Sequence, residues 1–165
     1  SLACGILSRL GYDVTAVSGK PDDGFLSSLG VRKIISRQDF LENTDLPLLK
    51  PRWAAVVDTV GGDILGAAIK STRESGIVTC CGLVASPKLP VTVFPFILRG
   101  VALFGIDSQH CPMPLRKDLW DNLASDWKPD MPGTMTTTIG LNELDPFIDN
   151  ILKGQIKGRT LVNMA

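Results

Sequence analysis

The tripeptide Ser18-Gly19-Lys20 is the part of the chain whose groups are best suited to bind an anion. It offers a hydroxyl, the backbone N–H of a glycine with no side chain in the way, and an ammonium group. Three donors within three residues match the oxygen atoms of a phosphate. A solvated turn with an ordinary surface lysine fits the local sequence about equally well.

Other polar residues stand where chemistry is conceivable. Arg37 could add a second cation beside such a phosphate or stack flat on an adenine. Asp58 could be a catalytic carboxylate, but we favour a structural role, in which it accepts backbone N–H groups of the next turn. His110 could act as an acid or a ligand. One histidine beside one cysteine, Cys111, does not make a zinc site, so we interpret His110 as a loop residue and expect no metal.

These residues must be positioned by the segment 54–86, around which the chain is organised. Short apolar runs at 54–57 and 77–81 predict two strands. The helix expected between them presents one apolar face, formed by Ile64, Leu65, Ala68 and Ile69. We expect Gly76 to end this helix. Two unbroken apolar runs joined by a helix predict parallel strands that are buried on both faces of the sheet.

The rest of the chain continues the alternation of strands and helices. Further strands are predicted at 13–17, 31–35, 101–106, 135–139 and 160–164, and helices at 1–10, 94–98, 115–127 and 143–153. This order predicts an α/β protein with a doubly wound, Rossmann-like parallel sheet. Ligands bind outside the carboxyl ends of such strands, so Gly61 and Gly82, which lack a Cβ, are candidate contacts.

A dinucleotide-binding fold begins with a strand and a glycine-rich turn, and neither precedes the helix with which this sequence opens. In the usual order, that first strand lies between the strands expected at 13–17 and 54–57. We therefore expect the chain to be an N-terminally incomplete piece of a larger protein. The turn after the second strand selects the cofactor in this fold. A basic residue there, with no carboxylate before Asp22, favours NADP over NAD.

Composition excludes several classes of protein. Seventeen basic residues balance seventeen acidic ones, so no global charge suggests a nucleic-acid or anionic-membrane partner. No apolar run approaches the roughly 20 residues that cross a bilayer. The four cysteines form no C-x-x-C pair and lie mostly among apolar residues, which predicts free thiols and a cytoplasmic protein.

Six segments, taken together, resemble a known family. LGYDVTAVSGK, SLGVRKIISRQDF, VVDTVGG, CGL, FPFILRGVALFGIDS and GRTLV occur in this order along the chain. They resemble the zinc-free quinone-oxidoreductase branch of the medium-chain dehydrogenase/reductases, and most closely its acrylyl-CoA reductase subgroup. The resemblance implies a two-domain, NADPH-dependent enzyme that reduces an activated C=C bond, in an enoyl thioester such as acrylyl-CoA or in a quinone.

The resemblance also implies particular site residues. The implied cofactor contacts are Ser18, Gly19, Lys20, Arg37, Leu83, Ile97, Ser108 and Arg159. The first three match the 2′-phosphate site and Arg37 the adenosine end. Leu83 and Ile97 match positions on the nicotinamide side, and Ser108 and Arg159 match further contacts. No catalytic residue is identified.

The resemblance extends to domains and partners. Residues 1–133 match a partial dinucleotide-binding domain, and 134–165 match a segment that returns to an N-terminal catalytic domain absent from this sequence. The strand at 101–106 matches the one through which subunits pair, which implies a homodimer. We expect the isolated piece to be inactive. Two alternatives stay open: a non-catalytic Rossmann-type binding or assembly module, and an NADP-dependent alcohol dehydrogenase with zinc ligands upstream.

Overall fold

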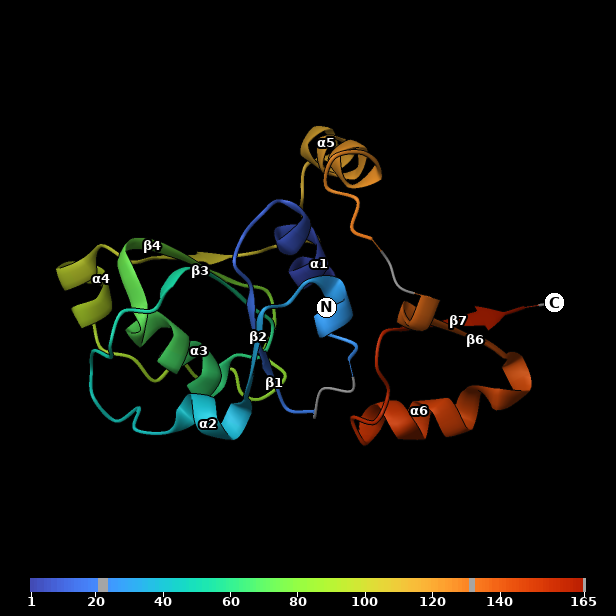
Figure 1. Cartoon of the computed structure of the whole chain (residues 1–165), viewed down its shortest axis with the longest axis horizontal. Helices are drawn as coiled ribbons and strands as arrows, with labels where there is room; N and C mark the ends of the chain where they lie inside the picture. Colours follow the sequence, from blue (N-terminus) through green and yellow to red (C-terminus); the bar gives the residue numbers. More distant parts are fainter. Residues whose placement is uncertain (21–23, 131–132, 165) are drawn as a thin grey trace. The chain divides into compact units, whose positions relative to one another are not determined.

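The computed structural model describes residues 1–20, 24–130 and 133–164. Along the chain, its elements are α1 (Leu2–Arg9), β1 (Thr15–Ser18), η1 (Ser27–Leu29), β2 (Lys33–Ser36), α2 (Arg37–Leu41), β3 (Trp53–Asp58), α3 (Gly62–Lys70), β4 (Thr72–Cys80), α4 (Phe94–Arg99), β5 (Ala102–Gly105), α5 (Met113–Ala124), η2 (Gly133–Met135), β6 (Thr136–Gly140), η3 (Leu141–Glu143), α6 (Leu144–Leu152) and β7 (Arg159–Asn163) (Figure 1). They form two compact units. The central unit comprises Val17–Pro21 and Ile35–Asp121, and the terminal unit comprises Ser1–Ala16, Asp22–Ile34 and Asn122–Ala165.

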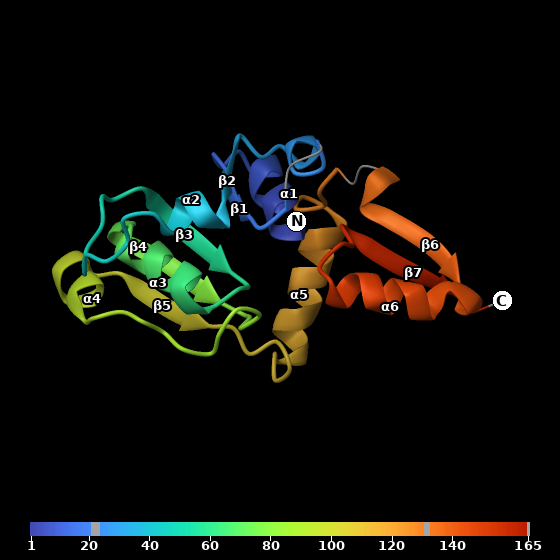
Figure 2. The ribbon, with the colours of Figure 1, turned by 90° about the horizontal axis from the view of Figure 1, so that it is seen from below.

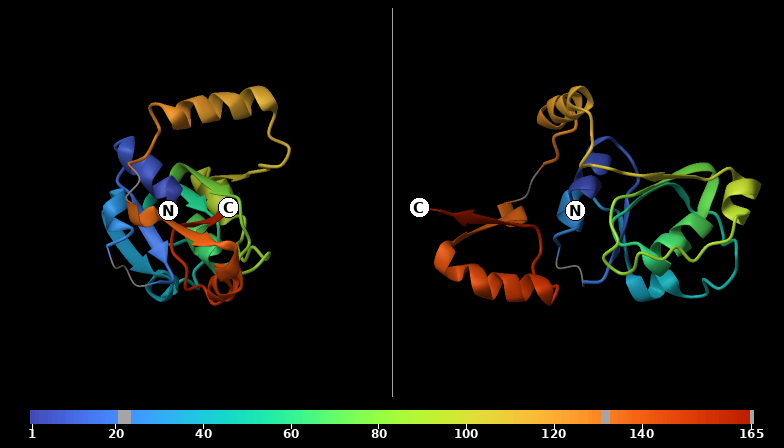
Figure 3. Two further views of the ribbon diagram at one scale, coloured as in Figure 1. Left: turned by 90° about the vertical axis from the view of Figure 1, so that its right-hand side faces the viewer. Right: turned by 180° about the vertical axis from the view of Figure 1, so that it is seen from behind.

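A three-stranded parallel sheet in the order β3-β4-β5 forms the core of the central unit. The crossover helix α3 lies along one side of this sheet (Figures 1 and 3). Its side chains Leu65 and Ile69 pack against Val78 of β4 and against Val101. On the side of α3 that faces α2, Ile64 packs in a second cluster with Phe40, Ala67 and Ala68. This strand–helix–strand unit confirms the parallel arrangement predicted from the two apolar runs.

The opposite face of the sheet is open, so the prediction of burial on both faces is wrong. Register pairs Val57 of β3 with Thr79 of β4, and Thr79 with Phe104 of β5, which places these side chains on one face. Val57, Ile77 and Phe104 are 48%, 47% and 52% exposed. The physical reason is that α3 covers the face carrying Val78, and the second face lacks an equivalent cover in the described part of the chain.

The helix α3 ends six residues before Gly76, which corrects the expected boundary. The hydroxyls of Ser71 and Thr72 donate to the carbonyls of Ala67 and Ala68 at 2.7 and 2.8 Å, and so they complete the last turn. Gly76 instead lies within β4. A Cβ there would lie 2.4 Å from the Thr72 methyl carbon, so the glycine is required by close packing inside the strand.

The remaining strands form two separate pairs. β1 pairs with β2, and β6 pairs in parallel with β7, with α6 along the second pair (Figure 2). In the terminal unit, Val14, Ala16 and Val31 form a small core, against which Cys4 and Leu7 of α1 pack. β1 and β3, the strands that flank the first strand in a complete dinucleotide-binding fold, belong to different sheets. The described chain is thus a Rossmann-like fold whose first strand is not among its elements.

Candidate cofactor site

At or just after the carboxyl ends of four strands, a side-chain oxygen fixes the turn that follows. The residues are Ser18 at the end of β1, Ser36 at the end of β2, Asp58 at the end of β3, and Asp107 after β5. Each accepts the backbone N–H of a residue two or three positions further on. Ligands of parallel sheets bind outside these strand ends, so the four oxygens organise the turns that could contact a ligand.

The Ser18 hydroxyl is used within its own turn. Its Oγ accepts the N–H of Lys20 and donates to the carbonyl oxygen of Lys20, both at 3.0 Å. A hydroxyl has a single hydrogen, so in this arrangement Ser18 has none to offer a phosphate. The turn also contains the backbone N–H of Gly19 and the ammonium group of Lys20. Asp22, the nearest following carboxylate, lies outside the described residues.

Arg37, the first residue of α2, lies against Gly19. A Cβ added to Gly19 would be 3.2 Å from Nε of Arg37 and 3.3 Å from its Cζ. Any side chain at position 19 would therefore press on the guanidinium. The structure thus brings Ser18, Gly19, Lys20 and Arg37 together, with two cationic residues beside an open backbone N–H. A guanidinium and an ammonium are the groups that bind phosphate oxygens most strongly.

Asp58 holds the turn between β3 and α3. Its side chain is buried, at 4% exposure, and its Oδ2 accepts the N–H groups of Gly61 at 2.9 Å and Val60 at 3.3 Å. Both carboxylate contacts are to the backbone of the next turn, which confirms the structural role favoured from the sequence.

Gly61 and Gly82 allow two backbone segments to approach each other. Gly61 has φ +73°, and a Cβ there would lie 2.5 Å from the carbonyl oxygen of Ser86. A Cβ on Gly82 would lie 2.3 Å from the carbonyl oxygen of Thr59. The turn after β3 and the loop after β4 thus cross where only glycine fits. This crossing accounts for both glycines, so their missing Cβ atoms do not by themselves indicate a ligand.

Two further predicted contacts lie at the carboxyl edge of the sheet, and one does not. Leu83, 64% exposed, follows β4, and Ser108 follows β5. Ile97 lies on α4, where the neighbouring Arg99 donates to the carbonyl of Thr72, the first residue of β4. Thr72 pairs with Trp53 at the start of β3, and the six residues of β3 up to Asp58 span roughly 20 Å. Ile97 is therefore not brought together with Leu83: α4 lies at the end of the sheet where the strands begin (Figure 2).

Arg159 opens β7 and belongs to the terminal unit, whereas the other predicted contacts belong to the central unit. Its guanidinium donates to the carbonyl of Gly158 at 3.4 Å. The cofactor contacts assigned to Arg159, Leu83, Ile97 and Ser108 stay predictions.

Sequence reasoning missed Asp107. Its Oδ1 accepts the N–H groups of Gln109 and His110, both at 3.1 Å, and its Oδ2 lies 2.7 Å from Nδ1 of His110. The hydrogen bond from the His110 side chain, followed by that from its backbone N–H, lowers the pKa of the Asp107 carboxyl. His110 is an exposed loop residue, as expected. The rule that identified Asp58, a carboxylate at a strand end, also applies to Asp107.

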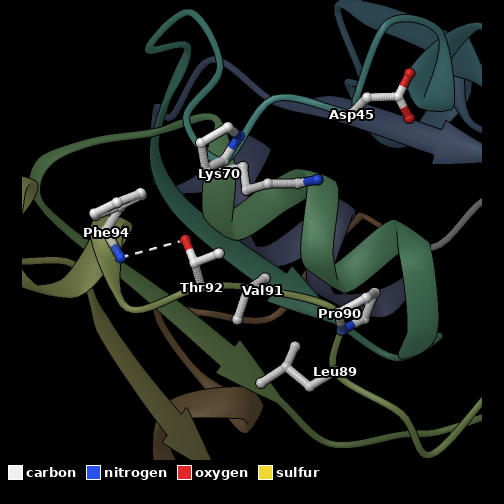
Figure 4. A pocket seen from close by; sticks show the side chains of 8 residues that line it. Asp45, Lys70, Leu89, Pro90, Val91, Thr92 and Phe94 are labelled. Carbon is white, nitrogen blue, oxygen red and sulfur yellow. Dashed lines mark hydrogen bonds between the residues drawn. The ribbon is translucent and has the colours of Figure 1, made fainter.

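An open pocket of about 530 Å³ lies away from these turns (Figure 4). Its lining comes from the loop before β3, the end of α3, the segment before α4 and the first residue of α4: Asp45, Pro47, Lys70, Leu89, Pro90, Val91, Thr92 and Phe94. The Lys70 ammonium donates to the carbonyl of Thr44. None of the predicted cofactor contacts lines this pocket, so it has no part in the candidate site.

Three general features of the described residues complete the chemical picture. Within 1–20, 24–130 and 133–164, no three His, Cys, Asp or Glu side chains gather closely enough to hold a metal ion. No helix in these ranges has the length and apolar character needed to cross a membrane. The cysteines Cys4, Cys80, Cys81 and Cys111 are free thiols.

Individual proteins match this chain, although no family model does. The chain is 38% identical over 165 residues to the protein named quinone oxidoreductase YhfP of Bacillus subtilis. It is 39% identical over 165 residues to acrylyl-CoA reductase AcuI of Ruegeria pomeroyi. Both alignments include 99% of this chain and 50% of the relative. The chain therefore spans about half the length of the curated relatives it matches.

Solved structures match the fold as well. The yhdH oxidoreductase of Salmonella enterica, in complex with NADP, has a TM-score of 0.89 at 39% identity. The yhfP protein of Bacillus subtilis, with NAD bound, has a TM-score of 0.91 at 38% identity. Each match covers 99% of this chain and 50% of the other. The Rossmann-like fold predicted from the sequence is thereby confirmed.

Proposed function

We propose that the chain is the NADPH-binding part of an oxidoreductase. The proposal is based on its alignment, over 99% of its length, with half of the length of a quinone oxidoreductase and of an acrylyl-CoA reductase. The whole protein would reduce an activated C=C bond, in an enoyl thioester such as acrylyl-CoA or in a quinone. NADPH supplies the hydride in such a reaction. The chain's own residues bind and orient the adenosine end of the cofactor.

The contact between Arg37 and Gly19 carries this proposal. The 2′-phosphate is the group that distinguishes NADPH from NADH, and it needs cations and N–H donors at the end of the second strand. Lys20 and the Gly19 N–H provide them immediately after β1, and Arg37 adds a guanidinium whose Nε lies 3.2 Å from the position of a Cβ on Gly19. Ser18 holds the turn in shape through its two hydrogen bonds to Lys20.

Substituting Lys20 tests the proposal, with NADPH and NADH compared in parallel. In the full-length protein, Lys20→Ala should weaken NADPH binding by roughly ten- to a hundredfold, since a hydrogen bond to a charged group contributes about 1.5–3 kcal/mol. NADH binding should hardly change, because NADH has no 2′-phosphate. Dissociation constants from fluorescence titration provide the measurement. Lys88→Ala, which removes an exposed lysine of the same central unit, is the control.

Equal losses for the two cofactors would contradict the phosphate site. Failure of the unaltered protein to bind either cofactor would favour a non-catalytic Rossmann-type module instead.

We further propose that the protein forms a homodimer through residues 101–106. β5 is the edge strand of the β3-β4-β5 sheet, and an apolar edge invites pairing with another chain. Phe104 and Ile106 are 52% and 50% exposed, whereas Leu103 packs toward the core beneath α3. Phe104 is therefore the side chain with which to test the interface.

The remaining assignments are proposals of the same kind. Residues 134–165, which contain the β6–α6–β7 unit, would join the catalytic domain of the whole protein. A cytoplasmic location agrees with the four free thiols, because reducing compartments keep cysteines in this state.

A further inference from the structure

The turn after β5 is fixed by one carboxylate and carries a predicted cofactor contact. Asp107 accepts the N–H groups of Gln109 and His110 at 3.1 Å and the Nδ1–H of His110 at 2.7 Å. An ionised carboxylate only accepts, so Nδ1 is the donor in the last contact. These three hydrogen bonds close the turn around Ser108, although the Asp107 side chain is 64% exposed.

The backbone of Ser108 is also fixed by a hydrogen bond to its carbonyl oxygen. Nη2 of Arg116 on α5 donates to this carbonyl oxygen at 2.7 Å. The Ser108 hydroxyl, in contrast, makes no hydrogen bond to any residue that the structure describes. Ser18 shows the opposite arrangement, because its hydroxyl is used within its own turn. Of the two serines, Ser108 is thus the one with a fixed backbone and an available hydroxyl.

The position of the turn suits a ligand of the sheet. The N–H of Ile106 donates to the carbonyl of Cys80 at 2.9 Å, which extends the ladder between β4 and β5 by one residue. Asp107 therefore lies at the carboxyl edge of the sheet. The loop that contains Leu83 leaves β4 at the same edge. Ligands of parallel sheets bind outside this edge.

We propose that Asp107 is a positioning residue for cofactor binding: it fixes the turn that presents the Ser108 hydroxyl to NADPH. The inference rests on the proposed function, since it takes Ser108 as a cofactor contact. A donor on a backbone that is already ordered loses less conformational freedom on binding than a donor on a mobile loop. The carboxylate acts through the backbone of the turn, without touching the cofactor.

A double-mutant cycle in the full-length protein tests this coupling. NADPH dissociation constants are measured for the unaltered protein, Asp107→Ala, Ser108→Ala and the double variant. Each single substitution should weaken binding about tenfold, the size of one hydrogen bond to a charged group. The double variant should bind no more weakly than Ser108→Ala alone, because Asp107 acts only through Ser108. Full additivity, or unchanged binding by either single variant, overturns the proposal.

Rescue and control variants separate positioning from stability. Asp107→Asn keeps a carbonyl oxygen that can accept the backbone N–H groups, so it should recover most of the affinity lost in Asp107→Ala. Asp121→Ala, which removes a carboxylate that is also 64% exposed, should leave binding unchanged. A lower melting temperature for Asp107→Ala at unchanged affinity overturns the proposal. If Lys20→Ala weakens NADPH binding but the Asp107 and Ser108 variants do not, only this inference fails; if Lys20→Ala also has no effect, the proposed cofactor site fails.

Discussion

Replacing Arg99 tests the packing that joins α4 to the rest of the central unit. The guanidinium lies where three segments meet. Its Nη2 donates to the carbonyl of Leu49 at 2.7 Å, and its Nη1 donates to the carbonyls of Lys70 and Thr72 at 2.9 and 3.1 Å. One side chain therefore connects α4 with the loop before β3, the end of α3 and the start of β4. Arg99→Ala removes all three connections.

The expected loss follows from the number and environment of these hydrogen bonds. Leaving a buried acceptor without a partner costs about 1–3 kcal/mol. The three contacts are only partly buried, so water can reach the carbonyls after substitution, and about 1 kcal/mol for each is the appropriate magnitude. We expect Arg99→Ala to lower the free energy of unfolding by about 3 kcal/mol. The free energy of unfolding of Arg99→Lys should lie between those of the unaltered protein and Arg99→Ala, because one ammonium group cannot make all the hydrogen bonds of a planar guanidinium.

Urea unfolding provides the measurement, with the midpoint expected to fall at an unchanged slope. Arg73→Ala, on the exposed part of β4, is the matched control and should change stability by no more than about 0.5 kcal/mol. If Arg99→Ala is no more destabilising than Arg73→Ala, the three hydrogen bonds do not stabilise the fold and the reasoning is refuted.

Three further predictions concern the edge strand, one glycine and one carboxylate. Phe104→Lys should convert the proposed dimer into monomers in light scattering, because a charge on an edge strand opposes pairing; a persistent dimer would place the interface elsewhere. Gly61→Ala should lower the unfolding free energy by about 1–3 kcal/mol, since φ is +73° and the new Cβ would lie 2.5 Å from the Ser86 carbonyl; an unchanged urea midpoint would contradict this. Hydrogen bonds from His110 lower the pKa of Asp107, so their stabilisation is complete above the ordinary aspartate range and is lost as pH falls through the lowered pKa. Amide exchange of that turn in acid is the check, and loss of protection already above the ordinary range would contradict it.

The order of strands and helices could be predicted from the sequence because it depends on apolar periodicity. The crossover unit around α3 and the short helix α4 both follow from such patterns. The end of α3 could not, because it is set by the hydroxyls of Ser71 and Thr72, which bond back to the last turn, and not by Gly76. Burial on both faces was wrong for a similar reason: apolar composition indicates that a strand can be buried, but the packing of other elements decides which face is covered.

Part of the candidate site could also be predicted. Donor chemistry identified the turn at Lys20, and the convergence of Arg37 with Gly19 agrees with it. The use of the Ser18 hydroxyl within the turn was not predictable, because residue types alone do not reveal which partner a hydroxyl chooses. Ile97 shows the same limit. Its assignment came from resemblance, and only the three-dimensional structure reveals that α4 lies where the strands of the sheet begin.

The side-chain oxygens at the strand ends have a consequence for protein engineering. The shape of each turn depends on a hydrogen bond between one side-chain oxygen and a backbone N–H two or three residues later. The side chains of the residues between these two positions take no part in it. The four residues that supply the oxygen are Ser18, Ser36, Asp58 and Asp107. Apart from Gly19, where a side chain would press on Arg37, the intervening side chains can therefore vary without loss of the turn geometry. A library aimed at a new cofactor or substrate preference should keep these four residues, Gly19 and Gly61 constant and randomise the other positions that follow each of the four. Libraries that randomise the four as well would mix altered recognition with disordered loops, and most members would lose function for the second reason.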